Sequence, residues 1–153
     1  MIRQNSEVDF DFVIKQREEG PTIGIEVMSR KDITETADRA FREKLWRAGL
    51  LHGILVTSET VRIYEDLLLG DGPLTYGIRE ARAEDILSTV SADRKDLEDA
   101  AHFTARVSQW LQLLVENWGA AIPPHLTEPL ISLIPAATEG ELVRGMFLED
   151  VSK

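Results

Sequence analysis

The chain contains no cysteine among its 153 residues. Disulfide bonds, thiolate zinc sites and cysteine nucleophiles are therefore excluded. Long apolar runs are also missing, since no stretch approaches the roughly 18 residues that suggest a membrane-spanning helix. The first residues, M-I-R-Q-N-S-E-V-D, lack the basic flank and apolar core of a signal peptide. We therefore expect a cytoplasmic protein that does not enter a membrane.

Basic residues are outnumbered, since the chain has 17 Lys and Arg against 27 Asp and Glu. The resulting formal net charge of −10 opposes non-specific attraction to nucleic acid. The charge is unevenly spread. Residues 30–47 contain six basic and four acidic side chains, whereas residues 92–153 contain five basic and ten acidic ones. A basic helix beside an acidic C-terminal segment is compatible with a local phosphate-facing surface, but such a distribution is more often a solvated face. The 43% hydrophobic content is typical of a folded domain.

Two apolar strands are expected near the start, Val8–Lys15 and Thr22–Arg30, joined by a polar turn. Strict alternation would place the apolar side chains of the first strand on one face and its acidic ones on the other. The predicted apolar face consists of Val8, Phe10, Phe12 and Ile14. Acidic side chains at the centre of such strands are costly to bury unless they are paired or bind a cation.

The next segments alternate between helix and strand signals. A capping box at Asp32–Glu35 predicts the start of a helix, and Gly49 fits its C-terminal cap. Later elements are expected at His52–Ser58, Val61–Asp66 and Thr75–Arg79 as strands, the last at a sheet edge, and at Ala83–Val90 as a short helix. This order predicts an α/β fold with a sheet of mixed direction.

The C-terminal part has helical spacing. It predicts a helix from about Asp93 to Trp118, a short helix at Leu126–Ile134 interrupted by Pro129, and a last helix that begins at a second capping box, Thr138–Glu141, and ends near Glu149. We therefore expect an α/β core at residues 1–91 and a helical extension at residues 92–153 that packs on the core or on a partner.

The central acidic side chains suggest a metal site. Asp11 and Glu26, with Asp9 as an accessory, come from adjacent predicted strands. Two carboxylates can hold Mg²⁺ while water and a substrate phosphate fill the other positions. The alternative is that these residues are solvent-facing members of an edge pair.

The order of motifs is more specific than this spacing. D-F-V-I, a turn ending in Gly-Pro, I-E-V-x-x-R, a capped helix and G-I-L-V-T-S-E-T-V-R-I-Y-E follow one another along the chain. This arrangement resembles the PD-(D/E)xK nuclease superfamily, and in particular the N-terminal nuclease-like domain of type I restriction enzyme R subunits. The resemblance covers roughly residues 8–69 and implies a restriction endonuclease-like fold.

The resemblance implies a role for individual residues. Asp11 and Glu26 match the two carboxylate ligands of a catalytic Mg²⁺ or Mn²⁺, and the carbonyl of Val27 would complete the metal site. The family's catalytic lysine falls on Met28, whose thioether can neither activate water nor stabilise charge on a phosphate. Lys31, three residues further on, is the expected substitute, with Lys44 and Arg47 on the following helix as alternatives.

A second departure concerns the start of the chain. The family usually has a helix before the first of these strands, and only seven residues precede Val8. An uncovered strand edge invites association, so we expect a homodimer or a partner protein that covers the sheet. Two functions remain open. The first is a nuclease-like, DNA-associated protein with weak or lost activity. The second is a non-catalytic interaction or regulatory module that keeps only the fold.

Overall fold

The computed structural model describes residues 7–67, 72–90 and 100–151. Its centre is a six-stranded sheet in the order β5-β4-β3-β2-β1-β6. β2 and β3 run parallel, and the other neighbouring strands run antiparallel. The predicted α/β class with a mixed sheet is thus confirmed. The strands are β1 (Glu7–Gln16), β2 (Gly20–Val27), β3 (His52–Val56), β4 (Thr60–Asp66), β5 (Tyr76–Arg82) and β6 (Glu141–Glu149).

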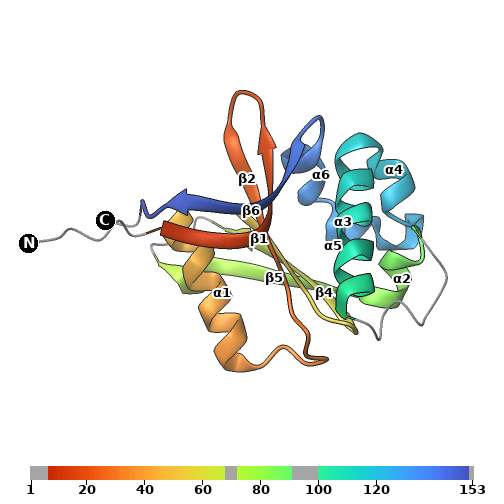
Figure 1. The fold of residues 1–153 in the computed structure, drawn as a ribbon, viewed down its shortest axis with the longest axis horizontal. Helices are drawn as coiled ribbons and strands as arrows, with labels where there is room; N and C mark the ends of the chain where they lie inside the picture. Colours follow the sequence, from red (N-terminus) through yellow and green to blue (C-terminus); the bar gives the residue numbers. More distant parts are fainter. Residues whose placement is uncertain (1–6, 68–71, 91–99, 152–153) are drawn as a thin grey trace, which may run out of the picture.

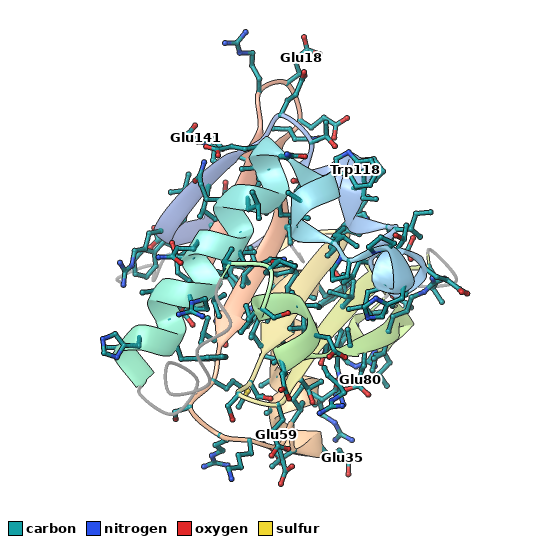
Figure 2. All side chains as sticks on the ribbon, turned by 90° about the vertical axis from the view of Figure 1, so that its right-hand side faces the viewer. Glu18, Glu35, Glu59, Glu80, Trp118 and Glu141 are labelled. Carbon is teal, nitrogen blue, oxygen red and sulfur yellow. The ribbon has the colours of Figure 1, made fainter. Side chains whose placement is uncertain are left out.

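Helices cover both faces of this sheet (Figure 1). α1 (Glu35–Ala48) connects β2 to β3 and packs on one face. α3 lies across the other face, and Figure 2 views the molecule from that side. The helices of this second layer are α2 (Ala83–Leu87), α3 (Ala100–Glu116), α4 (Trp118–Ala121), α5 (Thr127–Leu130) and α6 (Leu133–Ala137). Short 3₁₀ turns lie at Pro73–Thr75 and Pro124–Leu126.

Two apolar cores result, one on each side of the sheet. The α1-side core contains Val8, Phe10, Val13, Phe41, Leu45, Leu50, Leu55, Tyr64, Tyr76 and Leu148. The larger α3-side core joins alternate strand residues to the helices of the second layer. Trp110 is fully buried there, and its indole N–H donates to the carbonyl of Ala121 at 3.0 Å. Burial on both faces explains why β3 is a continuous apolar run rather than an alternating one.

The predicted single apolar face of the first strand is wrong. Val8 and Phe10 belong to the α1-side core, whereas Phe12 and Ile14 belong to the α3-side core. The change of face occurs at Asp11, where the pairing of β1 with β6 passes from Phe10–Met146 to Phe12–Arg144. The residue opposite Asp11 is Gly145, whose φ of +65° is a conformation that other residues rarely adopt. β1 is bent along its length (Figure 1).

Helix α1 ends as predicted and begins slightly later. Its N-cap is Thr34, whose hydroxyl accepts from the amide of Ala37 at 3.1 Å, rather than the expected Asp32. Its C-cap is Gly49 in the left-handed conformation. The helix packs closely on β3 because Gly53 has no side chain; a methyl group there would lie 2.5 Å from Leu45.

The predicted last helix is also wrong. Residues 141–149 form β6, which pairs antiparallel with β1 along Glu7–Lys15. Its apolar side chains find partners on β1, since Leu148 lies opposite Val8 and Met146 opposite Phe10. A strand pairing across more than 120 residues of sequence overrides the local capping-box signal. The C-terminal part of the chain therefore contributes a strand to the central sheet as well as helices.

The expected homodimer or partner protein rests on an uncovered strand edge at β1. β1 instead lies between β2 and β6 and is not an edge strand. The homodimer or partner protein remains a prediction without this support.

The remaining strands agree with the sequence pattern, and β5 lies at the sheet edge as predicted. The predicted helix start near Asp93 lies outside the described residues. Within the described ranges, no helix has the length and apolarity needed to cross a membrane.

Candidate functional site

The site lies where the β1–β2 hairpin opens. The last residue pair of this ladder is Phe12–Ile25, and Asp11 and Glu26 are the next residue on each strand. In place of a ladder bond, the carboxylate Oδ2 of Asp11 accepts from the amide of Val27 at 2.8 Å. This hydrogen bond ties Asp11 to the end of β2. The opening of the hairpin therefore holds both predicted carboxylates and the backbone of Val27.

Helix α1 adds a lysine to this opening. The Nζ of Lys44 contacts the Oε1 of Glu26 and lies 3.9 Å from the Oδ1 of Asp9. It also lies 4.9 Å from the centre of the Phe10 ring, a favourable cation–π position. Lys44 comes one turn after Phe41, which packs edge-on against Phe10. Packing of α1 on β1 thus brings its ammonium group to the carboxylates. We call Asp9, Asp11, Glu26 and Lys44 the Lys44 cluster.

The surroundings of Lys44 in the Lys44 cluster shift its pKa. Burial lowers the pKa of Lys44 below its usual 10.5, and the negative charges of Asp9 and Asp11 partly oppose this shift. The side chain of Lys44 is 22% exposed, compared with 70% for Asp9. The ammonium is therefore sheltered while part of its acidic surroundings faces solvent. Such a lysine holds its proton less tightly than a free one.

A pocket of about 350 Å³ opens beside the Lys44 cluster, between the β1–β6 pair and α3. Asp9, Asp11 and Val27 line it from β1 and β2, Thr104 lines it from α3, and Arg144 from β6. The guanidinium of Arg144 lies 5.9 Å from the centre of the Phe12 ring. A cation from β6 and two of the carboxylates therefore line the same pocket.

The structure joins two of the predicted site residues directly, because Asp11 accepts from the amide of Val27. Glu26, one position beyond the ladder on β2, contacts Lys44. The fourth, Lys31, is exposed in the loop that follows β2, and no described contact joins it to the carboxylates. β2 ends at Val27, after which the amide of Met28 donates to the carbonyl of Val56 and Met28 packs on the α1-side core. The chain then leaves the sheet before it reaches Lys31. Lys44, one of the two alternatives, contacts Glu26.

Sequence reasoning missed the contribution of β6, because residues 141–149 were expected to be helical. The signal was present in E-L-V-R-G-M-F-L-E, where apolar residues extend to both sides of a glycine. The other alternative lysine substitute, Arg47, binds Asp150 at 2.8 Å and is thereby engaged elsewhere.

A second group of charges on α1 serves as a contrast. Asp38 binds Arg42 at 2.8 Å and Arg62 at 3.1 Å, and it accepts from the hydroxyl of Tyr64 at 2.5 Å. Arg62 also binds Glu80 at 2.9 Å. We call Asp38, Arg42, Arg62, Tyr64 and Glu80 the Asp38 cluster. Burial raises the pKa of Asp38, but the hydrogen bonds from Tyr64 and Arg42 outweigh this and lower it overall. Its groups bind one another, which suits a structural role.

Metal binding at the Lys44 cluster would need more than side chains. Within the described ranges, no group of three or more His, Cys, Asp or Glu side chains is placed to hold a metal ion. Two carboxylates with a backbone carbonyl and water is a donor set that suits Mg²⁺ or Mn²⁺, which retain several waters in proteins.

Comparison of the sequence and the structure with protein-family models, curated proteins and solved structures finds no match. The function must therefore be argued from the geometry of the Lys44 cluster and its pocket.

Proposed function

We propose that this chain is a nuclease-like protein of the PD-(D/E)xK type, which acts on phosphodiesters with the help of Mg²⁺ or Mn²⁺. The observation that carries the proposal is the approach of Lys44 to the carboxylates at the opening of the β1–β2 hairpin. In this interpretation Lys44 replaces the lysine that is missing at Met28. The restriction endonuclease-like fold is part of the same proposal, supported by the hairpin, the crossover helix α1 and the parallel strand β3.

The donor atoms suit such a cation. Asp11 uses one carboxylate oxygen for the amide of Val27, and a carboxylate has a second oxygen that can coordinate a metal. Glu26 contacts Lys44 through Oε1, which leaves the same capacity at its other oxygen. Asp11, Glu26 and the carbonyl of Val27 would hold the ion. When bound, the ion would polarise a phosphate and lower the pKa of a bound water.

Lys44 would supply what the carboxylates cannot. Its ammonium can stabilise negative charge that develops on a phosphate, an effect that typically changes the rate by a factor of about 10²–10³. Asp9, at the exposed side of the cluster, would keep the lysine charged until substrate arrives.

The experiment is a calorimetric titration of the protein with Mn²⁺. Cleavage of single- and double-stranded DNA and RNA is measured in parallel. We expect binding heat in the wild type and its loss in Asp11→Asn and Glu26→Gln. The matched control is Glu7→Gln, which removes an exposed carboxylate from the same strand β1 outside the cluster. Equal heats from all four proteins would overturn the metal site.

A second function has one observation in its favour. The contact of Glu26 with Lys44 neutralises one of the two ligands within the protein, as a structural ion pair would. In that case the chain is a non-catalytic interaction module, in which the fold is kept and the chemistry is lost. A wild type that neither binds Mn²⁺ nor cleaves any of the four substrates would favour this function.

A further inference from the structure

The pocket beside the Lys44 cluster contains two side chains from β6 that the proposed chemistry does not use. Arg144 and Phe147 both line this pocket. They are three residues apart, and in a straight strand such residues point to opposite faces. Gly145, with its φ of +65°, lies between them and lets both side chains face the same space. The bend in β6 thus assembles a cation and an aromatic ring at one pocket.

Phe147 is 64% exposed, compared with 42% for Trp118, the other exposed aromatic side chain in the described part of the chain. It lies directly opposite Asp9 on β1. An exposed ring at the mouth of a polar pocket is a platform on which a flat, partly apolar group can stack. Arg144 is also exposed, which leaves its guanidinium accessible to an anionic group that enters the pocket.

The size and charge of the pocket restrict the ligand. A volume of about 350 Å³ lies near the lower end of the roughly 300–1,000 Å³ range of ligand pockets, so it suits one small unit and not a double helix. Asp9 and Asp11 repel a phosphate unless a cation neutralises them. A ligand with one phosphate and one planar base therefore fits when the metal is bound.

The geometry points to a site for one unpaired nucleotide of a single-stranded nucleic acid, with the base stacked on Phe147 and a phosphate beside Arg144. This inference rests on the proposed function, because it specifies the substrate of the same site. Base pairing would hide the face of a base inside the stack, so a duplex could not use Phe147 in this way. β6 thereby makes the site selective for single strands or frayed ends.

The test is fluorescence anisotropy with a labelled single-stranded oligonucleotide and its duplex, in Ca²⁺ so that the carboxylates are neutralised. We expect the single strand to bind at least tenfold more tightly than the duplex. Phe147→Ala should weaken single-strand binding about tenfold or more, in line with stacking energies. Arg144→Ala should weaken binding and reduce its dependence on salt. Matched controls are Ile131→Ala, an exposed apolar residue in the second helix layer, and Arg17→Ala, at the β1–β2 turn; both should bind like the wild type.

Equal binding of single strand and duplex, or unchanged binding in both Phe147→Ala and Arg144→Ala, would overturn the inference. Calorimetry with Mn²⁺ separates this failure from that of the proposed function. A wild type that binds Mn²⁺ while both Phe147→Ala and Arg144→Ala bind the oligonucleotide normally rejects only the nucleotide site. A wild type that gives no heat with Mn²⁺ rejects the proposed function.

Discussion

Helix α1 contributes to two clusters of charged side chains, and these differ in how completely their charges are matched. The Asp38 cluster has two acidic and two basic side chains, and its members are joined by short ion pairs and a tyrosine hydrogen bond. The Lys44 cluster has three acidic side chains and one basic side chain, and it adjoins an open pocket.

Under the proposed function, this difference separates charges that stabilise the fold from charges that bind a cation. Matched charges in a partly buried network stabilise the packing of α1 on the sheet, because removing one partner leaves another unpaired. Carboxylates in excess of their cations repel one another, and an added cation relieves that repulsion. The comparison predicts opposite responses of the two clusters to mutation.

The largest expected effect is on catalysis. In Lys44→Met the rate of metal-dependent cleavage should fall by a factor of about 10²–10³, because a preorganised charge donor is lost. The matched control is Lys31→Met, which removes the lysine that the sequence favours and that the structure leaves in an exposed loop. Its rate should stay within about twofold of the wild type. Single-turnover cleavage with Mn²⁺ measures both; a loss in Lys31→Met alone would restore Lys31 to the site.

The next effect is on stability. Asp38→Asn should lower the free energy of unfolding by about 3 kcal/mol at pH 7, since Arg42 and Arg62 lose a charged partner. Asp11→Asn should change it by less than about 1 kcal/mol, because an amide oxygen can still accept from Val27 and one repulsive charge is removed. Urea unfolding compares the two. Similar losses in both variants would erase the distinction between the clusters.

The Asp38 effect should also depend on pH. The folded-state pKa of Asp38 is lowered, so the carboxylate stabilises the fold above its ordinary pKa of 3.8. This contribution is lost as the pH falls through the lower, folded-state value. The stability gap between wild type and Asp38→Asn should therefore be constant near neutral pH and narrow below about pH 4. A gap that stays constant down to the acid transition would argue against an ionised Asp38.

A smaller effect is expected at the bend that shapes the pocket. Gly145→Ala should cost about 1–2 kcal/mol, because a side chain disfavours the positive φ, whereas open space around the position means that no clash adds to this cost. Gly119→Ala, in the short helix α4, is the control and should be neutral or slightly stabilising. Thermal unfolding measures both. A neutral Gly145→Ala would mean that β6 does not need its bend.

The smallest effect concerns the lysine itself. The pKa of Lys44 is lower in the folded protein than in the unfolded chain, so the unfolded chain binds more protons between the two values. As the pH rises towards 10.5, the free energy of unfolding of the wild type should therefore increase slightly relative to that of Lys44→Met. Unfolding at pH 7.5 and pH 9.5 tests the sign. A relative decrease over this interval would show that the carboxylates outweigh burial.

Much of the fold follows from local pattern. The hairpin of β1 and β2, helix α1 with its Gly49 cap, and strands β3 and β4 occur where periodicity and turn residues predict them. The carboxylates of Asp11 and Glu26 stand out for the same reason, since acidic residues interrupt apolar strands. β6 did not follow from local pattern, because a nine-residue segment that begins at a capping box is compatible with a helix. Pairing with the distant strand β1 makes it a strand.

The sequence alone determined which residue types are available to the site: two carboxylates on adjacent strands, a methionine where a lysine is expected, and several lysines nearby. Only the tertiary structure decided which lysine reaches them and what lines the pocket. Lys31 is closest along the chain to Met28, but β2 ends before it and the chain turns into solvent. Lys44 arrives because α1 packs back across the sheet, and Arg144 and Phe147 arrive because β6 pairs with β1; both depend on long-range packing that no local pattern encodes.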